Sequence, residues 1–276
     1  MSDFLCGYRR RLLCRGGGHK DEPALRWFGK VRTFVHAVFE ATTPHGSVYA
    51  RISPCVPAQV ADRSGRQAVP VVPHIVRPVS LAGPDLRAQL GIPQTATVFG
   101  RHGGYETFNI PEARAAVLKV ALSRPDLYFL LLNTRPLVPG GKGGLKNIIY
   151  LDAMVDDEGK AAFIRTCDAM LHARLDGETF GLAVAEFSVM NKPVITSSAH
   201  VQHGDADFHL KTLGTQGLYY HDTRSCEQLL LEFDRDAARR KDWNAYRRFE
   251  PPLVMEQLWK LLVPAPRTPA SPPTSS

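Results

Sequence analysis

Two glutamates, Glu178 and Glu186, stand eight positions apart in the segment ARLDGETFGLAVAEFSVMNKPVIT. The flanking stretches AMLHA and PVITS are apolar, so the sequence predicts a strand, a glycine-bearing loop, a helix and a second strand. The first N–H groups of a helix have no backbone partner and bind anions. At about 1.5 Å of rise per residue, the two carboxylates can flank a diphosphate at that helix terminus. Such a site suits a nucleotide sugar, which has hydroxyl-rich groups on both sides of its diphosphate.

The neighbouring residues of each acid indicate whether it has a binding role or simply faces solvent. The neighbours of Glu186 are the apolar residues Val184, Ala185 and Phe187, which predict a largely buried helix where a free carboxylate is costly. Glu178 stands just ahead of the helix, where an acid can simply favour the helix dipole. Two solvent-facing carboxylates are the structural alternative. The pattern favours a binding role for the pair.

A second group of candidate residues follows the predicted strand TATVFG, in the loop RHGGYETFNI. Arg101 can bind phosphate through two parallel N–H groups, and Gly103 and Gly104 allow the backbone to approach it closely. The alternative is an ordinary turn with a surface arginine. The position of this loop after the first strand of the predicted sheet favours a phosphate contact.

Three more polar residues stand at predicted strand ends. His172 and Arg174 follow the strand before the acidic loop, and Asn133 ends the apolar strand LYFLLLN. Parallel strands end at one edge of their sheet, where ligands of such sheets bind. We therefore expect all three near Arg101 as phosphate or sugar contacts.

The segment AHVQHGDADFHL contains several residue types that bind metals: His200, His203, Asp205, Asp207 and His209. Their spacing matches no zinc template, although an aspartate pair one residue apart binds a divalent ion in some nucleotide-sugar enzymes. We expect a loop that closes over the ligand, and no metal. A nucleophilic hydrolase is disfavoured, because there is no G-x-S-x-G elbow and no cysteine in an activating context.

The elements that position these residues form a regular alternation of strands and helices from Thr95 onward. This β-α-β repetition predicts an α/β fold, a doubly wound parallel sheet with helices on both faces. Before it, VRTFVHAVFE predicts a buried strand and VPVVPHIVRP an extended connector. Residues 31–77 are too few to form a second domain of comparable size.

The composition of the chain bears on its cellular compartment and on whether it binds a membrane or a nucleic acid. The chain has 276 residues, 44% of them apolar, and five cysteines without C-x-x-C spacing, which favours a reducing compartment and a cytoplasmic protein. No apolar run approaches the roughly 18 residues that span a bilayer. The arginine-rich start leaves an organellar transit peptide open. The net charge is +7, but the cluster DRDAARRKDWNAYRRFE mixes both signs, so we expect a solvated helix face and no nucleic acid.

The segment ETFGLAVAE followed by PVIT resembles the acid–seven–acid motif of retaining glycosyltransferases of GT-B architecture, in particular the family 4, or "glycosyl transferases group 1", type. VPVVPHIV resembles the hinge strand between the two halves of such enzymes. The resemblance spans Val31 to Leu231 and is strongest from Ala96 to Ser197. Within the chain it implies two parts: 31–77, a remnant of the acceptor-side domain with the hinge, and 78–250, a Rossmann-like domain that binds the nucleotide sugar. Residues 1–30 lack clear periodicity, so we expect disorder or one short helix there. We expect a terminal helix over 251–263 and, because residues 264–276 are rich in proline and serine, a disordered tail.

The resemblance also implies roles. Glu178 matches the acid that contacts the donor sugar, and Glu186 matches the acid that holds the ribose hydroxyls. Arg101 matches the residue that neutralises the leaving diphosphate. Such enzymes need no metal or other cofactor, because cations and a helix terminus stabilise the departing charge. The backbone N–H groups next to the first acid would contact the diphosphate and sugar, and they belong to Thr179, Phe180, Gly181 and Leu182.

Two departures from the family pattern are evident. A lysine usually stands five residues after the arginine, where this chain has Glu106, and Lys142 or Lys146 is a candidate replacement. The acceptor-binding half is also far too short. The chain is therefore a fragment, works with a partner chain that supplies the missing N-terminal half, or has kept binding without turnover.

Three hypotheses follow. The first is a glycosyltransferase that moves a sugar from a nucleotide sugar to an unknown acceptor (glycan, lipid or protein) with retention, or the donor-binding half of one. The second is a non-catalytic nucleotide or nucleotide-sugar binding module. The third is a basic scaffold or nucleic-acid partner.

Overall fold

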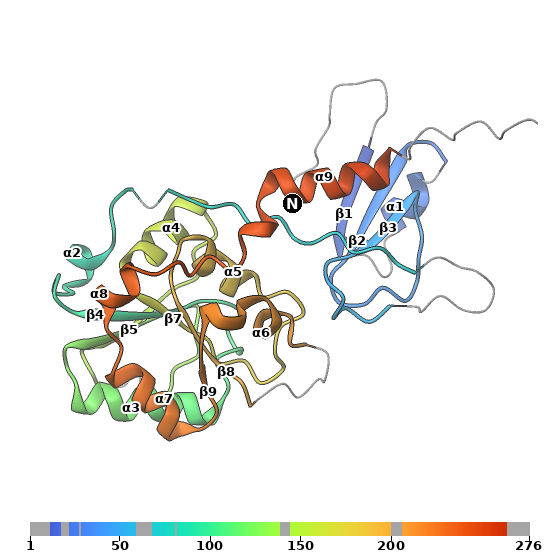
Figure 1. Cartoon of the computed structure of the whole chain (residues 1–276). Coiled ribbons are helices and arrows are strands. Elements are labelled where there is room, and N and C mark those ends of the chain that lie inside the picture. The colour runs from blue at the N-terminus through green and yellow to red at the C-terminus, as the bar shows by residue number, and fades with distance from the viewer. Residues whose placement is uncertain are drawn as a thin grey trace, which may run out of the picture.

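The computed structural model describes residues 12–17, 22–27, 29–58, 68–80, 82–138, 144–199 and 206–263. It contains two parallel sheets, one of three strands and one of six. Figure 1 shows them in separate lobes, which residues 70–80 connect. We call these parts the N-terminal lobe and the main lobe. The tail 264–276 lies outside the described residues.

The six-stranded sheet is the frame of the main lobe, and all its neighbouring strands run parallel. Its order is β6-β5-β4-β7-β8-β9, so the strand order reverses between β4 and β7. Ligands of such sheets bind at this reversal, beyond the strands' carboxyl ends. The predicted doubly wound α/β sheet is confirmed. The strands are β4 (Thr97–Arg101), β5 (Leu127–Leu132), β6 (Ile148–Leu151), β7 (Ala169–Leu171), β8 (Val194–Ser197) and β9 (Gly217–Tyr220).

Helices cover both faces of this sheet (Figure 1). One apolar cluster joins Val117 of α3 and Leu230 of α7 to Phe129 of β5, and another contains Phe163 of α4 and Phe187 of α5. Because both faces are covered, β5 is a continuous apolar run. The helices are α2 (Arg87–Leu90), α3 (Pro111–Ser123), α4 (Asp157–Thr166), α5 (Leu182–Val189), α6 (Phe208–Leu213), α7 (Thr223–Leu231), α8 (Arg235–Arg239) and α9 (Pro251–Leu262).

The N-terminal lobe consists of β1 (Leu12–Gly17), α1 (Glu22–Trp27), β2 (Arg32–Ala37) and β3 (Val48–Arg51), with β2 in the middle of the sheet. The strand predicted from VRTFVHAVFE is present as β2. The prediction of disorder or one short helix for 1–30 is wrong at β1, because LLCRGG pairs along its whole length with β2. Its two glycines hide that strand from a local pattern.

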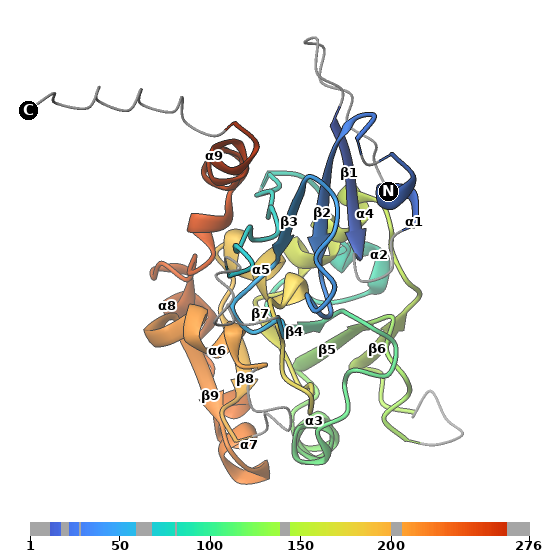
Figure 2. The same cartoon turned by 90° about the vertical axis from the view of Figure 1, so that its right-hand side faces the viewer.

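Two chain segments link the lobes. Val72 N donates to Arg51 O (2.9 Å) on the N-terminal side, and Val76 N donates to Phe249 O (2.9 Å) on the C-terminal side. From there α9 extends beside the three-stranded sheet (Figures 1 and 2). The connector predicted from VPVVPHIVRP therefore lies between the two sheets.

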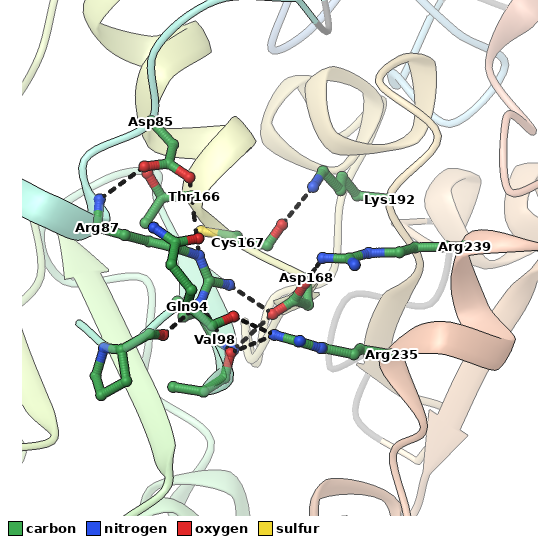
Figure 3. A network of polar contacts seen from close by, with 12 residues as sticks. Asp85, Arg87, Gln94, Val98, Thr166, Cys167, Asp168, Lys192, Arg235 and Arg239 are labelled. Carbon is green, nitrogen blue, oxygen red and sulfur yellow. Dashed lines mark hydrogen bonds and ion pairs between the residues drawn. The ribbon is translucent and has the colours of Figure 1, made fainter.

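A polar network lies at the amino-terminal ends of β4 and β7, around Asp168 (Figure 3). The buried carboxylate of Asp168 accepts from Arg87 Nη2 (2.8 Å), the backbone N–H of Val98 (3.0 Å) and Arg239 Nη2 (3.2 Å). It joins α2, β4 and α8, so it stabilises the fold without facing the ligand edge. In the described part of the chain, no helix combines the length and apolar character that crossing a membrane requires.

Candidate functional site

The site is built where the strand order reverses. β4 ends at Arg101 and β7 ends at Leu171, and the two strands are paired neighbours. The next residue after each strand is a histidine, His102 or His172. The acidic loop follows β7 and leads into α5.

Glu178 is held by two basic side chains. Its carboxylate accepts from Arg174 Nη1 (3.2 Å to each oxygen) and lies 3.4 Å from His172 Nε2. His172 is itself fixed, because its Nδ1 is 2.8 Å from Thr196 Oγ1. Burial raises the pKa of Glu178, but the hydrogen bond from His172 and the charges of its basic neighbours outweigh burial and leave the pKa below its usual value. Glu178 is therefore ionised at neutral pH.

Glu186 has a matching pair of partners. Its Oε1 accepts from Lys160 Nζ (3.0 Å), and its Oε2 lies 3.1 Å from His102 Nε2. The imidazole of His102 stacks on Phe187 with ring centroids 5.7 Å apart, which fixes its plane. Burial raises the pKa of Glu186, but His102 and Lys160 together lower it below its usual value. Each acid thus has one histidine from a strand end and one flexible cation.

Two left-handed glycines shape the acidic loop. Gly177 has φ 67° and Gly181 has φ 81°, a region that other residues seldom adopt. Between them, Glu178 N donates to Ala206 O (2.6 Å) and Phe208 N donates to Glu178 O (3.2 Å). The loop is therefore tied to the segment ahead of α6, and Gly181 turns the chain into α5.

Two cavities meet at the start of α5. The larger, of about 610 Å³, is lined by residues of both lobes: Val38, Phe39, Ile52, Cys55, Pro57, His74, Arg174, Asp176, Gly177, Glu178, Thr179, Phe180, Gly181, Leu182 and Ala206. The smaller, of about 470 Å³, lies between the connector and α4: Ile75, Val76, Arg77, Pro78, Val79, Asp157, Lys160, Ala161, Ile164, Leu182 and Glu186. Leu182, the first residue of α5, lines both. Of the predicted pair of acids, Glu178 lines the larger cavity and Glu186 lines the smaller one.

Eight of the predicted site residues lie at the two acids and their cavities, and four do not. Six of them line the larger cavity: Arg174, Glu178, Thr179, Phe180, Gly181 and Leu182. Glu186 lines the smaller cavity. His172 contacts Glu178 but lines neither cavity itself. The other four, Arg101, Gly103, Gly104 and Asn133, line neither cavity.

Arg101 organises its own loop instead of presenting free N–H groups. It is 2% exposed, and burial lowers its pKa to about 10. Asn133 completes the contact between the loops, since its Nδ2 donates to Gly103 O (2.9 Å). The two terminal nitrogens of Arg101 donate over 2.6–3.3 Å to the carbonyls of Gly104, Leu132 and Asn133 and the hydroxyls of Thr107 and Thr134.

Of the two candidate replacements for the missing lysine, only Lys146 belongs to the described residues, and it lines neither cavity. Glu106 pairs with Arg135 on the surface (2.9 Å). Lys146 is exposed and lines neither cavity, and Lys142 lies outside the described residues. The cations that do lie at the acids are Lys160 and Arg174.

The metal and nucleic-acid alternatives gain no support from the described residues. No three His, Cys, Asp or Glu side chains among them gather as metal ligands, and Asp207 pairs with Lys211 (2.8 Å). His200, His203 and Asp205 lie outside that part of the chain. The aromatic residues of the basic cluster, Trp243, Tyr246 and Phe249, are buried and cannot stack on bases.

Three residues of the site were not predicted. His102 directly follows Arg101, and the sequence gives no sign that the histidine, and not the arginine, lies at Glu186. Lys160 lies 26 positions before Glu186, with no local pattern that joins them. His74 belongs to the predicted connector, and its ring packs edge-on against Phe180 at 5.2 Å.

Comparisons with known proteins show the fold. Neither the protein-family models nor the curated protein sequences contain a match to this chain. Among solved structures, Anabaena Alr3699/HepE in complex with UDP-glucose matches at a TM-score of 0.58 and 15% identity, over 84% of this chain and 72% of that one. Sucrose-phosphate synthase from Thermosynechococcus elongatus matches at 0.56 and 17% identity, over 86% and 69%.

A third structure, a UDP-forming trehalose-phosphate synthase from Burkholderia xenovorans with glucose-6-phosphate, matches at 0.52 and 13% identity, over 71% of this chain and 52% of its own. This chain covers only 50% of another HepE structure. It thus spans between half and about seven-tenths of the solved structures named here. These matches show that the chain has the GT-B fold.

Proposed function

We propose that this protein is a glycosyltransferase of the retaining type, or the donor-binding half of one, which takes its sugar from a nucleotide sugar. One observation carries the proposal: two cavities, each with one acid of the pair, meet at Leu182, the first residue of α5. A nucleoside diphosphate sugar has three parts in the same order. The sugar would occupy the larger cavity at Glu178, the nucleoside the smaller cavity at Glu186, and the diphosphate the helix terminus between them.

The charges around the acids suit this arrangement. The unpaired N–H groups and dipole of a helix N-terminus favour a diphosphate. Arg174 and Lys160 line one cavity each and can turn from the acids to the phosphates. These two cations would take the role that the family resemblance assigns to Arg101. Neither the resemblance nor the basic residues at the site requires a metal, so we propose metal-independent transfer. We propose the cytoplasm as its location, because the cysteine spacing favours a reducing compartment.

Retention follows from the family resemblance. The acceptor oxygen would attack the anomeric carbon from the face that the diphosphate leaves, and the departing phosphate would take the acceptor's proton. The donor is proposed as a UDP-sugar, because HepE was solved with UDP-glucose and the Burkholderia relative is described as UDP-forming.

The second candidate is a nucleotide-sugar binding module without turnover. The small N-terminal lobe favours it, since the described part of that lobe has a three-stranded sheet against six strands in the main lobe. A partner chain that completes the acceptor side would restore transfer. Both candidates require the same donor site.

Hydrolysis of UDP-glucose by wild type and Glu178→Gln tests the proposal, with UDP affinity measured by calorimetry alongside. We expect wild type to bind UDP and release glucose, and the variant to keep UDP affinity but lose about 100-fold in rate. Glu106→Gln, an exposed acid paired with Arg135, is the control and should match wild type. UDP binding without turnover would favour the module. Absence of UDP binding, or measurable hydrolysis at equal rates in wild type and Glu178→Gln, would overturn the assignment.

A further inference from the structure

The two walls of the larger cavity differ in chemistry. The main lobe contributes charged side chains and the acidic loop, including Arg174, Asp176 and Glu178. The N-terminal lobe contributes Val38, Phe39, Ile52, Cys55 and Pro57. Among the described lining residues, those of the N-terminal lobe have no charged, amide or hydroxyl side chain. We call these five residues the apolar wall.

The apolar wall belongs to the ligand edge of its own sheet. Val38 and Phe39 directly follow β2, and Ile52 directly follows β3, so they stand at the carboxyl ends of parallel strands. The acidic loop stands at the corresponding edge of the main sheet. The carboxyl edges of the two sheets therefore face one cavity, the edges where ligands of parallel sheets bind.

Within the apolar wall, Phe39 is the residue that most strongly indicates a bound apolar group. Phe39 is 73% exposed although it lines the cavity, whereas Ile52, another residue of the apolar wall, is 2% exposed. A large aromatic ring left in water next to a site gains from any apolar group that covers it. Cys55 does not change this character, because burial raises the pKa of its thiol and keeps it neutral.

The wall also disfavours a carbohydrate acceptor. A pyranose can stack one C–H face on Phe39, but the hydroxyls at its rim would lose water against Val38 and Ile52 without gaining a hydrogen bond. A group without hydroxyls would lose nothing there and would remove both its own surface and that of Phe39 from water. The cavity of about 610 Å³ is within the range of about 300–1,000 Å³ that accommodates drug-sized molecules, so it has room for such a group beside a donor sugar.

On the basis of the proposed function, we propose that the acceptor is an alcohol with an apolar body, an aryl or alkyl group that packs on Phe39 and the rest of the apolar wall. Its hydroxyl would face the acidic loop and the donor. In the transfer, the acceptor oxygen bonds to the anomeric carbon while the bond from that carbon to the diphosphate oxygen breaks. The acceptor's proton passes to the departing diphosphate, so charge and atoms balance.

His74 is placed to orient that hydroxyl. It lines the same cavity, and its ring is held edge-on against Phe180 at 5.2 Å. Burial lowers the pKa of His74 to about 4, so the ring is neutral at pH 7 and can both donate and accept a hydrogen bond. The acceptor would therefore bind with its polar end at His74 and its apolar end at Phe39.

Binding without turnover tests the proposal, so the result does not depend on catalysis. We would measure the affinity of 1-naphthol and of methyl α-glucoside for the full chain by ligand-observed NMR, with UDP affinity in parallel. We expect 1-naphthol to bind and methyl α-glucoside not to bind. Phe39→Ala should weaken 1-naphthol about tenfold and leave UDP affinity within twofold.

Leu122→Ala is the matched control, because Leu122 is 70% exposed on α3 and lines neither cavity. It should leave 1-naphthol binding unchanged. Equal losses in Phe39→Ala and Leu122→Ala, or tighter binding of methyl α-glucoside than of 1-naphthol, would overturn the apolar acceptor. Binding of 1-naphthol that depends on Phe39, in a protein that does not bind UDP, would retain the apolar site and refute the proposed donor.

Discussion

His102 Nε2 and Glu186 Oε2 lie 3.1 Å apart, on residues that come from the end of β4 and the middle of α5. The other carboxylate oxygen accepts from Lys160 Nζ. A ribose that hydrogen-bonds to Glu186 must therefore share this carboxylate with the histidine or displace the lysine. The lysine is the easier to displace, because His102 is fixed by its stack on Phe187 whereas an ammonium on a four-carbon stem is flexible.

Lys160→Met tests whether the displaced lysine contacts the diphosphate. A charge-assisted hydrogen bond contributes about 1.5–3 kcal/mol, so we expect UDP affinity to fall between about 10-fold and 100-fold. The affinity for uridine, which lacks phosphate, should be unchanged or higher. Calorimetry with both ligands measures the difference, and Lys119→Met, at an exposed lysine that pairs with Glu227, is the control. Equal losses for uridine and UDP would show that Lys160 acts only through Glu186.

Arg174→Ala separates binding from stability. Arg174 is about one-third exposed and pairs with Glu178 at 3.2 Å, so its loss should cost no more than about 1 kcal/mol of unfolding free energy. Its position in the larger cavity predicts a drop of at least about tenfold in UDP-glucose affinity. Urea unfolding and calorimetry on the same preparation give both numbers. A variant that unfolds much more easily but still binds UDP-glucose normally would contradict this assignment.

Arg101→Lys should show the opposite pattern. A lysine has one nitrogen in place of the two that hold five oxygens, so several buried carbonyls and hydroxyls lose their partner. We expect a loss of about 2–4 kcal/mol in unfolding free energy. UDP affinity should stay within about threefold once the protein is folded. If stability is unchanged while UDP affinity collapses, Arg101 contacts the phosphates as its family position implies.

The difference between the two arginines shows what local sequence can predict. The acidic loop was predictable because its strand, glycines and helix are contiguous, and the six-stranded sheet because its apolar runs alternate with helices. The role of Arg101 was not, because its partners include Asn133 and Thr134, which the pairing of β5 with β4 brings beside it. Nothing in the sequence near position 101 indicates those two hydrogen-bond acceptors. The same holds for β1, whose partner strand lies beyond α1.

His209 provides a pH-dependent test of the site's burial. It is 2% exposed, it packs on His172 with centroids 5.0 Å apart, and its Nδ1 has no hydrogen-bond partner among the described residues. Burial lowers its pKa to about 3, helped by His172 and Arg174 and opposed by Glu178 and Asp207. In the unfolded chain a histidine titrates near 6.5.

The sign of the pH effect follows from these two values. Between pH 6.5 and about 3 the unfolded chain binds a proton at His209 that the folded protein excludes, so the stabilisation present above pH 6.5 is lost as pH falls. In wild type this residue should contribute about 1.4 kcal/mol of unfolding free energy per pH unit.

His209→Leu cannot take up that proton and should flatten the slope of unfolding free energy against pH by this amount. Urea unfolding from pH 4.5 to 6 measures it, and His221→Leu, at an exposed position, should keep the wild-type slope. Equal slopes in wild type and His209→Leu would contradict this prediction, because they would mean that His209 binds its proton equally well in the folded and unfolded states.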